Sequence, residues 1–295
     1  MNELVTIDPK ELTTGVLHGY LLGAVGPRPI AFASTLSTEG VPNLAPFSFF
    51  NVFSANPPIL IFSPARRVRD NTTKHTLENV LATKEVVINV VNYDTVQQMS
   101  LASTEYGAGE NEFVKSGLTM LPSEVVAPFR VAESPVQFEC KVTKVEALGN
   151  KGGAGNLVFA EVVRIHIHKT VLNEKNGIDQ HKIDLVARMG GNWYSRANMG
   201  MFEVPKPLSS IGIGVDSLPS EVRNSSVLTG NNLGLLANVS TLPSQEEIQL
   251  FLEQNTSLQP VLNGADVSQK HKIAQDFLNN NNVSSAWKVL LANKQ

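Results

Sequence analysis

The chain has 295 residues, a formal net charge of −3 and a pI of about 6.1. A slightly acidic chain lacks the excess of lysine and arginine that binding to nucleic acid or an anionic membrane requires, so neither is expected as a partner. No apolar run reaches the roughly 18 residues needed to cross a bilayer, and no signal peptide is visible, so a cytoplasmic protein is predicted.

Apolar segments bounded by glycine and proline predict strands over most of the first 204 residues. The segment 30–36 follows Pro29, and 85–91 is rich in β-branched residues, as in a buried strand. Two longer strands, 136–148 and 157–171, are joined by a glycine-rich link. Two further strands are predicted over 45–53 and 57–63.

The helices predicted in this part of the chain are few and short. Apolar residues share one face of 76–84, and 94–101 begins with Asp94 and Gln97 at the spacing of a capping box. A third helix, around 111–115, is predicted to stop at Gly117. Many strands with a few rim helices predict a mainly β fold, a closed or half-open antiparallel barrel, and argue against alternating βαβ units.

The strand pattern ends after Pro205-Lys206-Pro207, where Asn, Ser and Gly become more frequent. Three short amphipathic helices are predicted beyond this point. One follows a capping box of Ser244 and Glu247, and the others carry apolar residues at helical spacing, Ile273, Phe277 and Leu278, then Trp287, Leu290 and Leu291. We therefore predict two domains, 1–204 and a mostly helical extension over 205–295, whose role the sequence does not indicate.

The most informative segment is a polar, basic loop between a predicted strand and a predicted helix. Backbone N–H groups at a helix start, hydroxyl donors and positive charge together suit a phosphate. The alternative, a solvated charged turn, is less favoured because hydroxyls and helix start accompany the charges. The loop carries four cations, Arg66, Arg67, Arg69 and Lys74, and three threonines, Thr72, Thr73 and Thr76.

A second group of residues has the character of a site for a flat heteroaromatic ring. Such a ring needs apolar walls and a few hydrogen-bonding groups. The sequence offers Ser34 and Thr35 at a strand end, Asn43 after a turn, and the segment Phe47-Ser48-Phe49-Phe50. The alternative is that these aromatic residues form the barrel core, and for Phe49 and Phe50 individually we expect core.

Other patterns give no comparable signal. No P-loop, Rossmann fingerprint, nucleophile elbow or zinc-protease motif is present. His166 and His168 would share one face of a strand, but without a carboxylate or cysteine expected there, a solvent-facing polar stripe is favoured over a metal site. The single cysteine, Cys140, excludes a disulfide within the chain and is expected to be buried and inert.

A series of motifs follows in one order between about residues 20 and 203. They are Arg28-Pro29-Ile30-Ala31, Ser34-Thr35, Gly40 with Asn43, Ala45-Pro46-Phe47-Ser48-Phe49-Phe50-Asn51, Pro57-Pro58, Arg69-Asp70-Asn71-Thr72-Thr73-Lys74-His75-Thr76 with Asn79, Glu112-Phe113 with Gly117-Leu118-Thr119, Ser134-Pro135-Val136 with Glu139-Cys140, and Arg188 with Gly190-Gly191 and Tyr194. Together they resemble the flavin reductase-like family of FMN-binding split β-barrels, which includes flavoredoxin. The last ninety or so residues lie outside the resemblance.

The resemblance implies a Greek-key antiparallel split barrel that forms a homodimer with FMN at the subunit interface. One departure is His75, where the family pattern usually has Asp. By position, the resemblance assigns the phosphate to Arg69, Asn71, Thr72, Thr73, Lys74 and Thr76, and the ring system to Ser34, Thr35, Asn43, Phe47, Ser48 and Phe49. Arg188 and Tyr194 would close the site, from the same or the other subunit.

The leading hypothesis is an FMN-dependent oxidoreductase, similar to an NAD(P)H:flavin reductase, with NADH or NADPH as a transient donor. A flavin accepts hydride itself, which agrees with the lack of a catalytic acid–base pair or nucleophile in the sequence. The alternative is a non-catalytic FMN-binding electron carrier or flavin reservoir. Pyridoxal phosphate or haem is a weaker option, because no motif places a Schiff-base lysine or an axial ligand.

Overall fold

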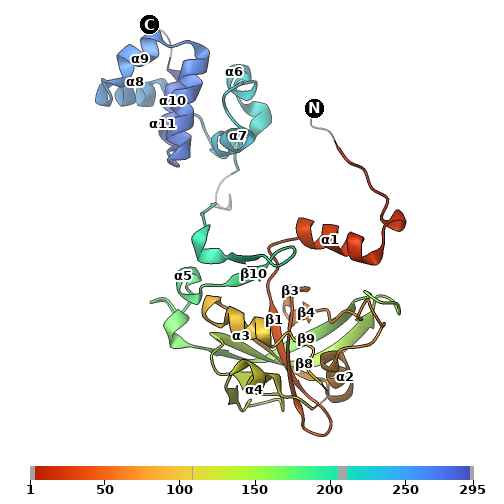
Figure 1. Ribbon diagram of the computed structural model, residues 1–295. Helices are drawn as coiled ribbons and strands as arrows, with labels where there is room; N and C mark the ends of the chain where they lie inside the picture. The colour runs from red at the N-terminus through yellow and green to blue at the C-terminus, as the bar shows by residue number, and fades with distance from the viewer. Residues whose placement is uncertain (1–3, 108, 205–210, 293–295) are drawn as a thin grey trace. The chain divides into compact units, whose positions relative to one another are not determined.

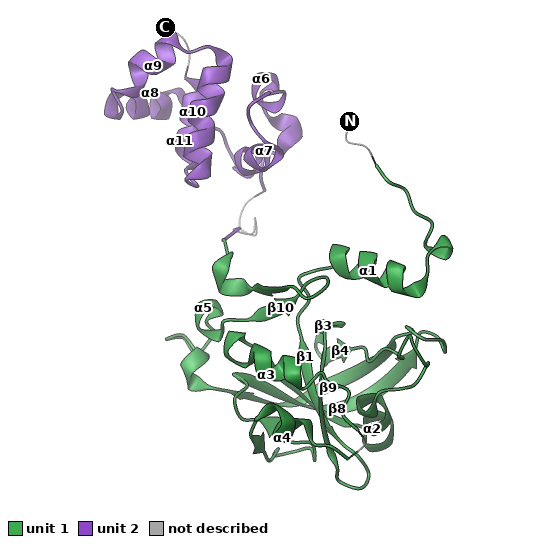
Figure 2. Cartoon of the chain, in the orientation of Figure 1, with its two compact units in different colours: residues 1–202 green, residues 203–295 purple. Residues whose placement is uncertain are grey.

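The computed structural model describes residues 4–107, 109–204 and 211–292, and the chain divides into two units, Met1–Phe202 and Glu203–Gln295 (Figures 1 and 2). The segment Pro205-Lys206-Pro207, where the sequence suggested a domain boundary, lies outside the described residues. No helix in the described ranges is both long and apolar enough to cross a membrane.

The first unit is built on one seven-stranded sheet in which every neighbouring pair is antiparallel. The strand order is β2-β1-β5-β8-β9-β4-β3, so β2 and β3 are the two edges and the described pairings leave the sheet open. The mainly β, antiparallel prediction is confirmed. The strands are β1 (Ala31–Leu36), β2 (Pro42–Phe47), β3 (Phe50–Ala55), β4 (Pro58–Phe62), β5 (Glu85–Val90), β8 (Val136–Ala147) and β9 (Asn156–Ile167).

Two predicted strands are corrected by the structure. The segment 45–53 is not one strand, because the chain breaks at Ser48 and Phe49 and its halves pair at opposite edges of the sheet, β2 with β1 and β3 with β4. The Phe49 carbonyl accepts a bond from Ser63 N–H, at 2.9 Å, which fixes this break against the end of β4. The strand predicted over 157–171 ends at Ile167 and is followed by a short 3-10 helix, Lys169–Val171.

Apolar side chains cover both faces of the sheet, and β1 shows the alternation. Ala31 and Ala33 belong to one core cluster, whereas Phe32 between them belongs to another. Helix α2 (His75–Thr83) adds Leu77 and Val80 to the first cluster. Helices α3 (Val96–Leu101) and α4 (Glu112–Ser116) add Met99 and Phe113 to the second.

The helix predictions were right in position but not in every cap. Gly117 adopts a left-handed φ of 66° directly after α4, as predicted. The capping box of Asp94 and Gln97 is wrong, because Tyr93–Thr95 is a 3-10 helix and α3 begins at Val96 without a side-chain cap. Helix α1 (Thr14–Ala24), not predicted, has no buried residue. The other small elements of this unit are 3-10 helices Pro9–Glu11 and Ala197–Met199, β6 (Met120–Leu121), β7 (Arg130–Val131), α5 (Gln180–Ile183), β10 (Val186–Arg188) and β11 (Tyr194–Arg196).

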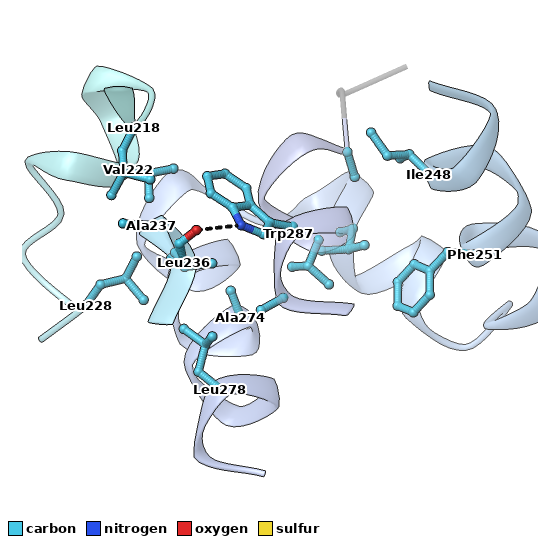
Figure 3. Close-up of a cluster of buried hydrophobic side chains, with 14 residues drawn as sticks. Leu218, Val222, Leu228, Leu236, Ala237, Ile248, Phe251, Ala274, Leu278 and Trp287 are labelled. Atoms are coloured by element: carbon cyan, nitrogen blue, oxygen red, sulfur yellow. Dashed lines mark hydrogen bonds between the residues drawn. The ribbon is translucent and has the colours of Figure 1, made fainter. Parts of the chain in front are cut away.

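The second unit is helical and has a core of its own. The indole of Trp287 is 1% exposed and donates a hydrogen bond to the Leu236 carbonyl at 3.0 Å (Figure 3). The predicted capping box of Ser244 and Glu247 is confirmed. Three predicted helices match α8, α10 and α11; the other three were missed. The helices are α6 (Ser220–Arg223), α7 (Gly230–Ala237), α8 (Gln245–Gln254), α9 (Leu258–Gly264), α10 (Val267–Asn279) and α11 (Val283–Leu291), preceded by a 3-10 helix, Val215–Ser217.

Candidate functional site

Three of the predicted site residues meet in a buried network of amides and hydroxyls. Asn43 Nδ2 donates to Thr35 Oγ1 at 3.2 Å and to Thr76 Oγ1 at 2.9 Å. Asn79 Nδ2, from the second turn of α2, also donates to Thr35 Oγ1, at 3.0 Å. All four side chains are buried. The network therefore joins the start of α2 to strands β1 and β2, and Asn79 is a member that the sequence did not single out as a site residue.

The basic loop is held in shape by its own side chains. Arg67 Nη1 donates to Thr72 Oγ1 at 3.0 Å and also bonds the Thr73 carbonyl. Arg66 Nε donates to Asn71 Oδ1 at 2.7 Å, and Asn71 adopts a left-handed φ of 58°. Because donors and acceptors within the loop satisfy one another, its backbone is fixed around the cations.

The glycine-rich link between β8 and β9 is hydrogen-bonded to the backbone of the basic loop, a role that the sequence did not reveal. Arg66 N–H donates to the Ala154 carbonyl and Gly153 N–H to the Arg66 carbonyl, both at 2.9 Å. A Cβ at Gly152 would lie 2.9 Å from the Val68 carbonyl oxygen, so only glycine allows this close approach.

Most polar groups of the loop already have partners. Thr72 Oγ1 donates to Asp70 Oδ1 at 2.7 Å, and Thr73 Oγ1 bonds the Glu78 carboxylate. Arg69 is exposed and pairs with Asp70 and Glu105, which raise its pKa. Arg67 pairs with Glu105 as well, at 3.0 Å.

Lys74 differs from the other cations of the loop. Its Nζ lies 5.4 Å from the centroid of the Phe47 ring, and among the described residues it has no carboxylate within 4 Å. Burial lowers the pKa of Lys74, the neighbouring Arg67 lowers it further, and Glu105 opposes the effect. Lys74 is thus a half-buried cation beside a second cation, without a counter-charge in contact.

The aromatic segment divides into core and surface. Phe47 is 6% exposed and packs on Phe62 with the ring centroids 5.4 Å apart, so its side chain is core. Phe49, expected in the core, is instead 39% exposed and meets His18 edge to face at 6.1 Å. Ser48 lies between them in the break separating β2 from β3. The Phe47 side chain is therefore not available to a ligand, whereas its backbone is.

Ser34 does not join the network around Thr35. Successive strand residues point to opposite faces, and Ser34 shares the face of Phe32 while Thr35 shares that of Ala33. The Ser34 Oγ is buried and has no hydrogen-bond partner among the described residues. A buried hydroxyl without a hydrogen-bond partner costs stability.

Arg188 and Tyr194 lie together in the β10–β11 hairpin. They are register partners, and the Arg188 guanidinium lies 4.6 Å from the centroid of the Tyr194 ring. Arg28 pairs with Arg188 through its backbone, and its buried guanidinium binds the carbonyls of Leu22, Val25 and Met189. Within the described residues, no hydrogen bond or ion pair joins this hairpin to the basic loop.

His166 corrects the expectation of a solvent-facing histidine without a carboxylate nearby. Its Nε2 lies 2.6 Å from Oε1 of Glu139, a side chain that is 0% exposed. Burial by itself would raise the pKa of Glu139, but hydrogen bonds from the N–H groups of Glu124 and Val125 and from His166 hold it below its usual value. His168 is exposed, as expected. Cys140 is buried, as predicted, and burial chiefly raises its thiol pKa.

A cleft of about 340 Å³ opens beside the start of α2. Its walls come from the β1–β2 turn with the start of β2, from α2, and from the chain leading into the first residue of α4. His75, the residue that departs from the family pattern, is one of the lining residues, as are Asn43 and Asn79 of the buried network. Carboxylates from all three wall segments also line it, Glu39, Glu78, Glu110 and Glu112.

Comparison with known proteins identifies the family. The family model described as the flavin reductase like domain matches residues 24–183, more than half of the chain. The chain belongs to the flavin reductase-like family. An uncharacterised protein of Aquifex aeolicus is 39% identical over 188 residues, which cover 64% of this chain and 93% of the relative. The resemblance stated from the motifs is thereby confirmed.

Several solved structures share the fold of this chain. Nitrilotriacetate monooxygenase component B from Bacillus cereus is 29% identical, with a TM-score of 0.65 over 69% of this chain and 100% of that one. The 2-nitrobenzoate 2-nitroreductase NbaA of Pseudomonas fluorescens is 26% identical, with a TM-score of 0.63 over 71% and 100%. Flavoredoxin of Desulfovibrio vulgaris, 21% identical with a TM-score of 0.53 over 63% and 93%, shares the fold alone.

Proposed function

We propose that the protein is an FMN-dependent oxidoreductase in which hydride from NADH or NADPH passes through the bound flavin. The observation that carries this proposal is Lys74, a half-buried cation beside Arg67 without a carboxylate in contact. A phosphate dianion at this position would supply the missing counter-charge and offset the cost of burying the ammonium group. Because the chain belongs to the flavin reductase-like family, we assign this phosphate to FMN.

In this proposal the basic loop binds the phosphate of FMN. Lys74 and Arg69 supply charge, and Asn71, Thr72, Thr73 and Thr76 supply donors or hold the loop in place. The Thr72 and Thr73 hydroxyls, now bonded to Asp70 and Glu78, would rotate toward the phosphate oxygens. The glycine-rich link fixes the backbone, so binding requires only side-chain rotation.

The ring system would lie along the ends of β1 and β2. Ser34, Thr35 and Asn43, with the backbone from Phe47 through Ser48 to Phe49, would form its edge contacts. The flavin supplies the hydride-accepting chemistry, and these residues bind and orient it. Positive charge from Lys74 near the ligand would also favour a reduced, anionic flavin.

We also propose a homodimer with the flavin at its interface and the sheet completed as a split barrel. Helix α1 is almost entirely apolar yet buries no residue in its own chain, and Val52 and Phe53 of edge strand β3 are each 64% exposed. Exposed apolar surface of this extent is typical of a protein interface. Arg188 and Tyr194, which have no hydrogen bond or ion pair with the loop among the described residues, would close the site of the partner subunit.

Substitution of Lys74 tests the phosphate assignment. Lys74→Ala is expected to weaken FMN binding about ten- to hundredfold, the loss of one charge-assisted hydrogen bond, measured by fluorescence titration. Lys144→Ala is the matched control, because Lys144 also lies over an aromatic ring, 5.3 Å from Phe159, but is paired with Glu146. Equal FMN affinity of Lys74→Ala and wild type would reject the assignment.

An anaerobic titration with NADH and NADPH then separates enzyme from carrier. If the proposal is right, the flavin absorption bands of the FMN-loaded protein bleach when either nucleotide is added. A flavin that stays oxidised would instead favour the electron carrier or flavin reservoir. A protein that binds no FMN would contradict both.

A further inference from the structure

A carboxylate from outside the basic loop is paired with two of its cations. Glu105, in the segment that follows α3, accepts a hydrogen bond from Arg67 Nε at 3.0 Å and is also bonded by Arg69 Nη2. Among the described residues, it is the one carboxylate that pairs with both arginines. Glu105 therefore offsets part of the positive charge that the loop presents to a ligand.

The cations of the loop differ in how far they are exposed. The side chain of Lys74 is half-buried, that of Arg67 is 20% exposed and that of Arg69 is 68% exposed. Glu105, 45% exposed, pairs with the two outer cations, and among the described residues it has no ion pair with Lys74. If the flavin ring lies along the strand ends and its phosphate binds Lys74, any part of the ligand beyond that phosphate would extend outward, toward the arginines and Glu105.

This order of charges favours one phosphate over two. A single phosphate at Lys74 meets an ammonium group that has no carboxylate within 4 Å among the described residues. A second phosphate further out would meet guanidinium groups that already have an anionic partner. It would also meet the negative charge of Glu105 itself, and like charges placed close together cost binding free energy.

We propose that Glu105 makes the loop selective for FMN, a phosphate monoester, over FAD, in which a diphosphate joins the flavin to adenosine. The inference rests on the proposed flavin function and adds to it a specificity-determining residue. Glu105 acts against the second phosphate and not at the position of the first. A purely structural role, in which Glu105 only ties its segment to the loop, would affect both flavins equally.

Substitution of Glu105 by glutamine tests the proposal, because Glu105→Gln removes the charge and keeps an acceptor oxygen for the arginines. The wild type is expected to bind FMN more tightly than FAD in fluorescence titrations. In Glu105→Gln, the FAD affinity should rise about tenfold, since a repulsion is lost and two guanidinium groups become available to the second phosphate. The FMN affinity should change much less. FAD binding by the variant should also depend more strongly on salt than FAD binding by the wild type.

Glu110→Gln is the matched control. Glu110 also lies between α3 and α4, and its side chain is 47% exposed, against 45% for Glu105. It pairs with Lys115 at 2.9 Å and, among the described residues, with no cation of the basic loop. Its substitution should therefore leave the selectivity between the two flavins at the wild-type value. Wild-type protein that binds FAD as tightly as FMN, or equal changes of both affinities in Glu105→Gln, would overturn the proposal.

Calorimetric titration with inorganic phosphate and pyrophosphate separates this inference from the flavin proposal, because these anions need no ring site. Glu105→Gln should strengthen pyrophosphate binding more than phosphate binding. If it does so in a protein that binds neither flavin, the flavin proposal is disproved and the discrimination by Glu105 between one phosphate and two is retained. If the protein binds FMN and Glu105→Gln changes neither selectivity, the role of Glu105 alone is disproved.

Discussion

The two units differ in what they bury. The first unit buries amides, hydroxyls and carboxylates within its sheet and around the start of α2, among them Thr35, Asn43, Asn79 and Glu139. In the described part of the second unit, the buried polar side chains are Asn232 and His271, and the rest of the core is apolar. Buried polar groups add little net stability, so their concentration in one unit indicates where function, rather than folding, determines the sequence.

The second unit instead relies on apolar packing and helix caps. Capping boxes begin α7, α8 and α10, and the core gathers around Trp287. Side chains of the chain itself therefore satisfy N–H donors at the starts of α7, α8, α10 and α11. The two units should therefore respond differently to the same kind of substitution.

The largest effect is expected at the centre of the second unit. Trp287→Ala removes the largest of the fully buried side chains that the structure describes, together with its bond to Leu236, and should cost about 3–5 kcal/mol of unfolding free energy. Hydrogen exchange followed by mass spectrometry should show faster exchange in α7, α10 and α11, with the first unit unchanged. Trp193→Ala, at a 78% exposed tryptophan, is the control. Faster exchange throughout the sheet would show that the units are not independent.

A smaller effect is expected in the polar network of the first unit. Asn43→Ala leaves the Thr35 and Thr76 hydroxyls without one donor and should cost about 1–3 kcal/mol in denaturant unfolding. Because Asn43 and Asn79 both donate to Thr35, the double variant with Asn79→Ala should deviate from additivity. Strict additivity would mean that the network does not act as a unit.

Helix capping in the second unit should contribute about 1 kcal/mol per helix. Ser244 accepts a bond from Glu247 N–H at 3.2 Å, so Ser244→Ala should destabilise α8 by roughly that amount. Ser257, at the same position before α9, makes no side-chain cap, and Ser257→Ala should change the stability little. Equal effects of the two substitutions on thermal unfolding would refute the role assigned to caps.

The smallest expected effect on stability comes from His271 and appears only below neutral pH. His271 is 4% exposed and its Nδ1 lies 2.7 Å from Ser225 Oγ; burial chiefly lowers its pKa below the ordinary 6.5. The unfolded chain therefore takes up the proton first, so stability is full above about pH 6.5 and falls as the pH drops toward the folded pKa. His271→Gln should flatten this dependence in the second unit, followed by Trp287 fluorescence in a Trp193→Phe background. If the pH dependence of stability persisted in His271→Gln, another titratable group would be responsible for it.

Local patterns predicted the elements but not the way that they pair. The β-branched segment 85–91 and the glycine after α4 carry their structural preference in the residues themselves, and both predictions were right. The predicted strand 45–53 is interrupted at Ser48 because its two halves pair at opposite edges of the sheet. No local sequence pattern encodes that pairing. Helix α1 escaped prediction because it is apolar on all sides and therefore lacks a helical period.

In the candidate site, too, features that are local in the sequence were predictable and features that depend on distant segments were not. The basic loop was recognisable because its charges and hydroxyls are contiguous in the sequence. The carboxylate partner of His166 was not, because Glu139 lies on the neighbouring strand β8 opposite Arg164, and only the pairing of β8 with β9 brings it diagonally across from His166. The acidic cleft could not be predicted either, since its walls come from segments as far apart as Glu39 and Glu112.

The edge strand β2 has a consequence for how the sheet can grow. Its outward-facing backbone positions are Pro42, Leu44 and Pro46, and two of these lack an N–H group altogether. The third, Leu44 N–H, is already bonded to the buried Glu112 carboxylate at 3.1 Å. This edge therefore offers an incoming strand no free donor, as a protected edge should. Any added strand, from a peptide or another chain, must join the sheet at β3.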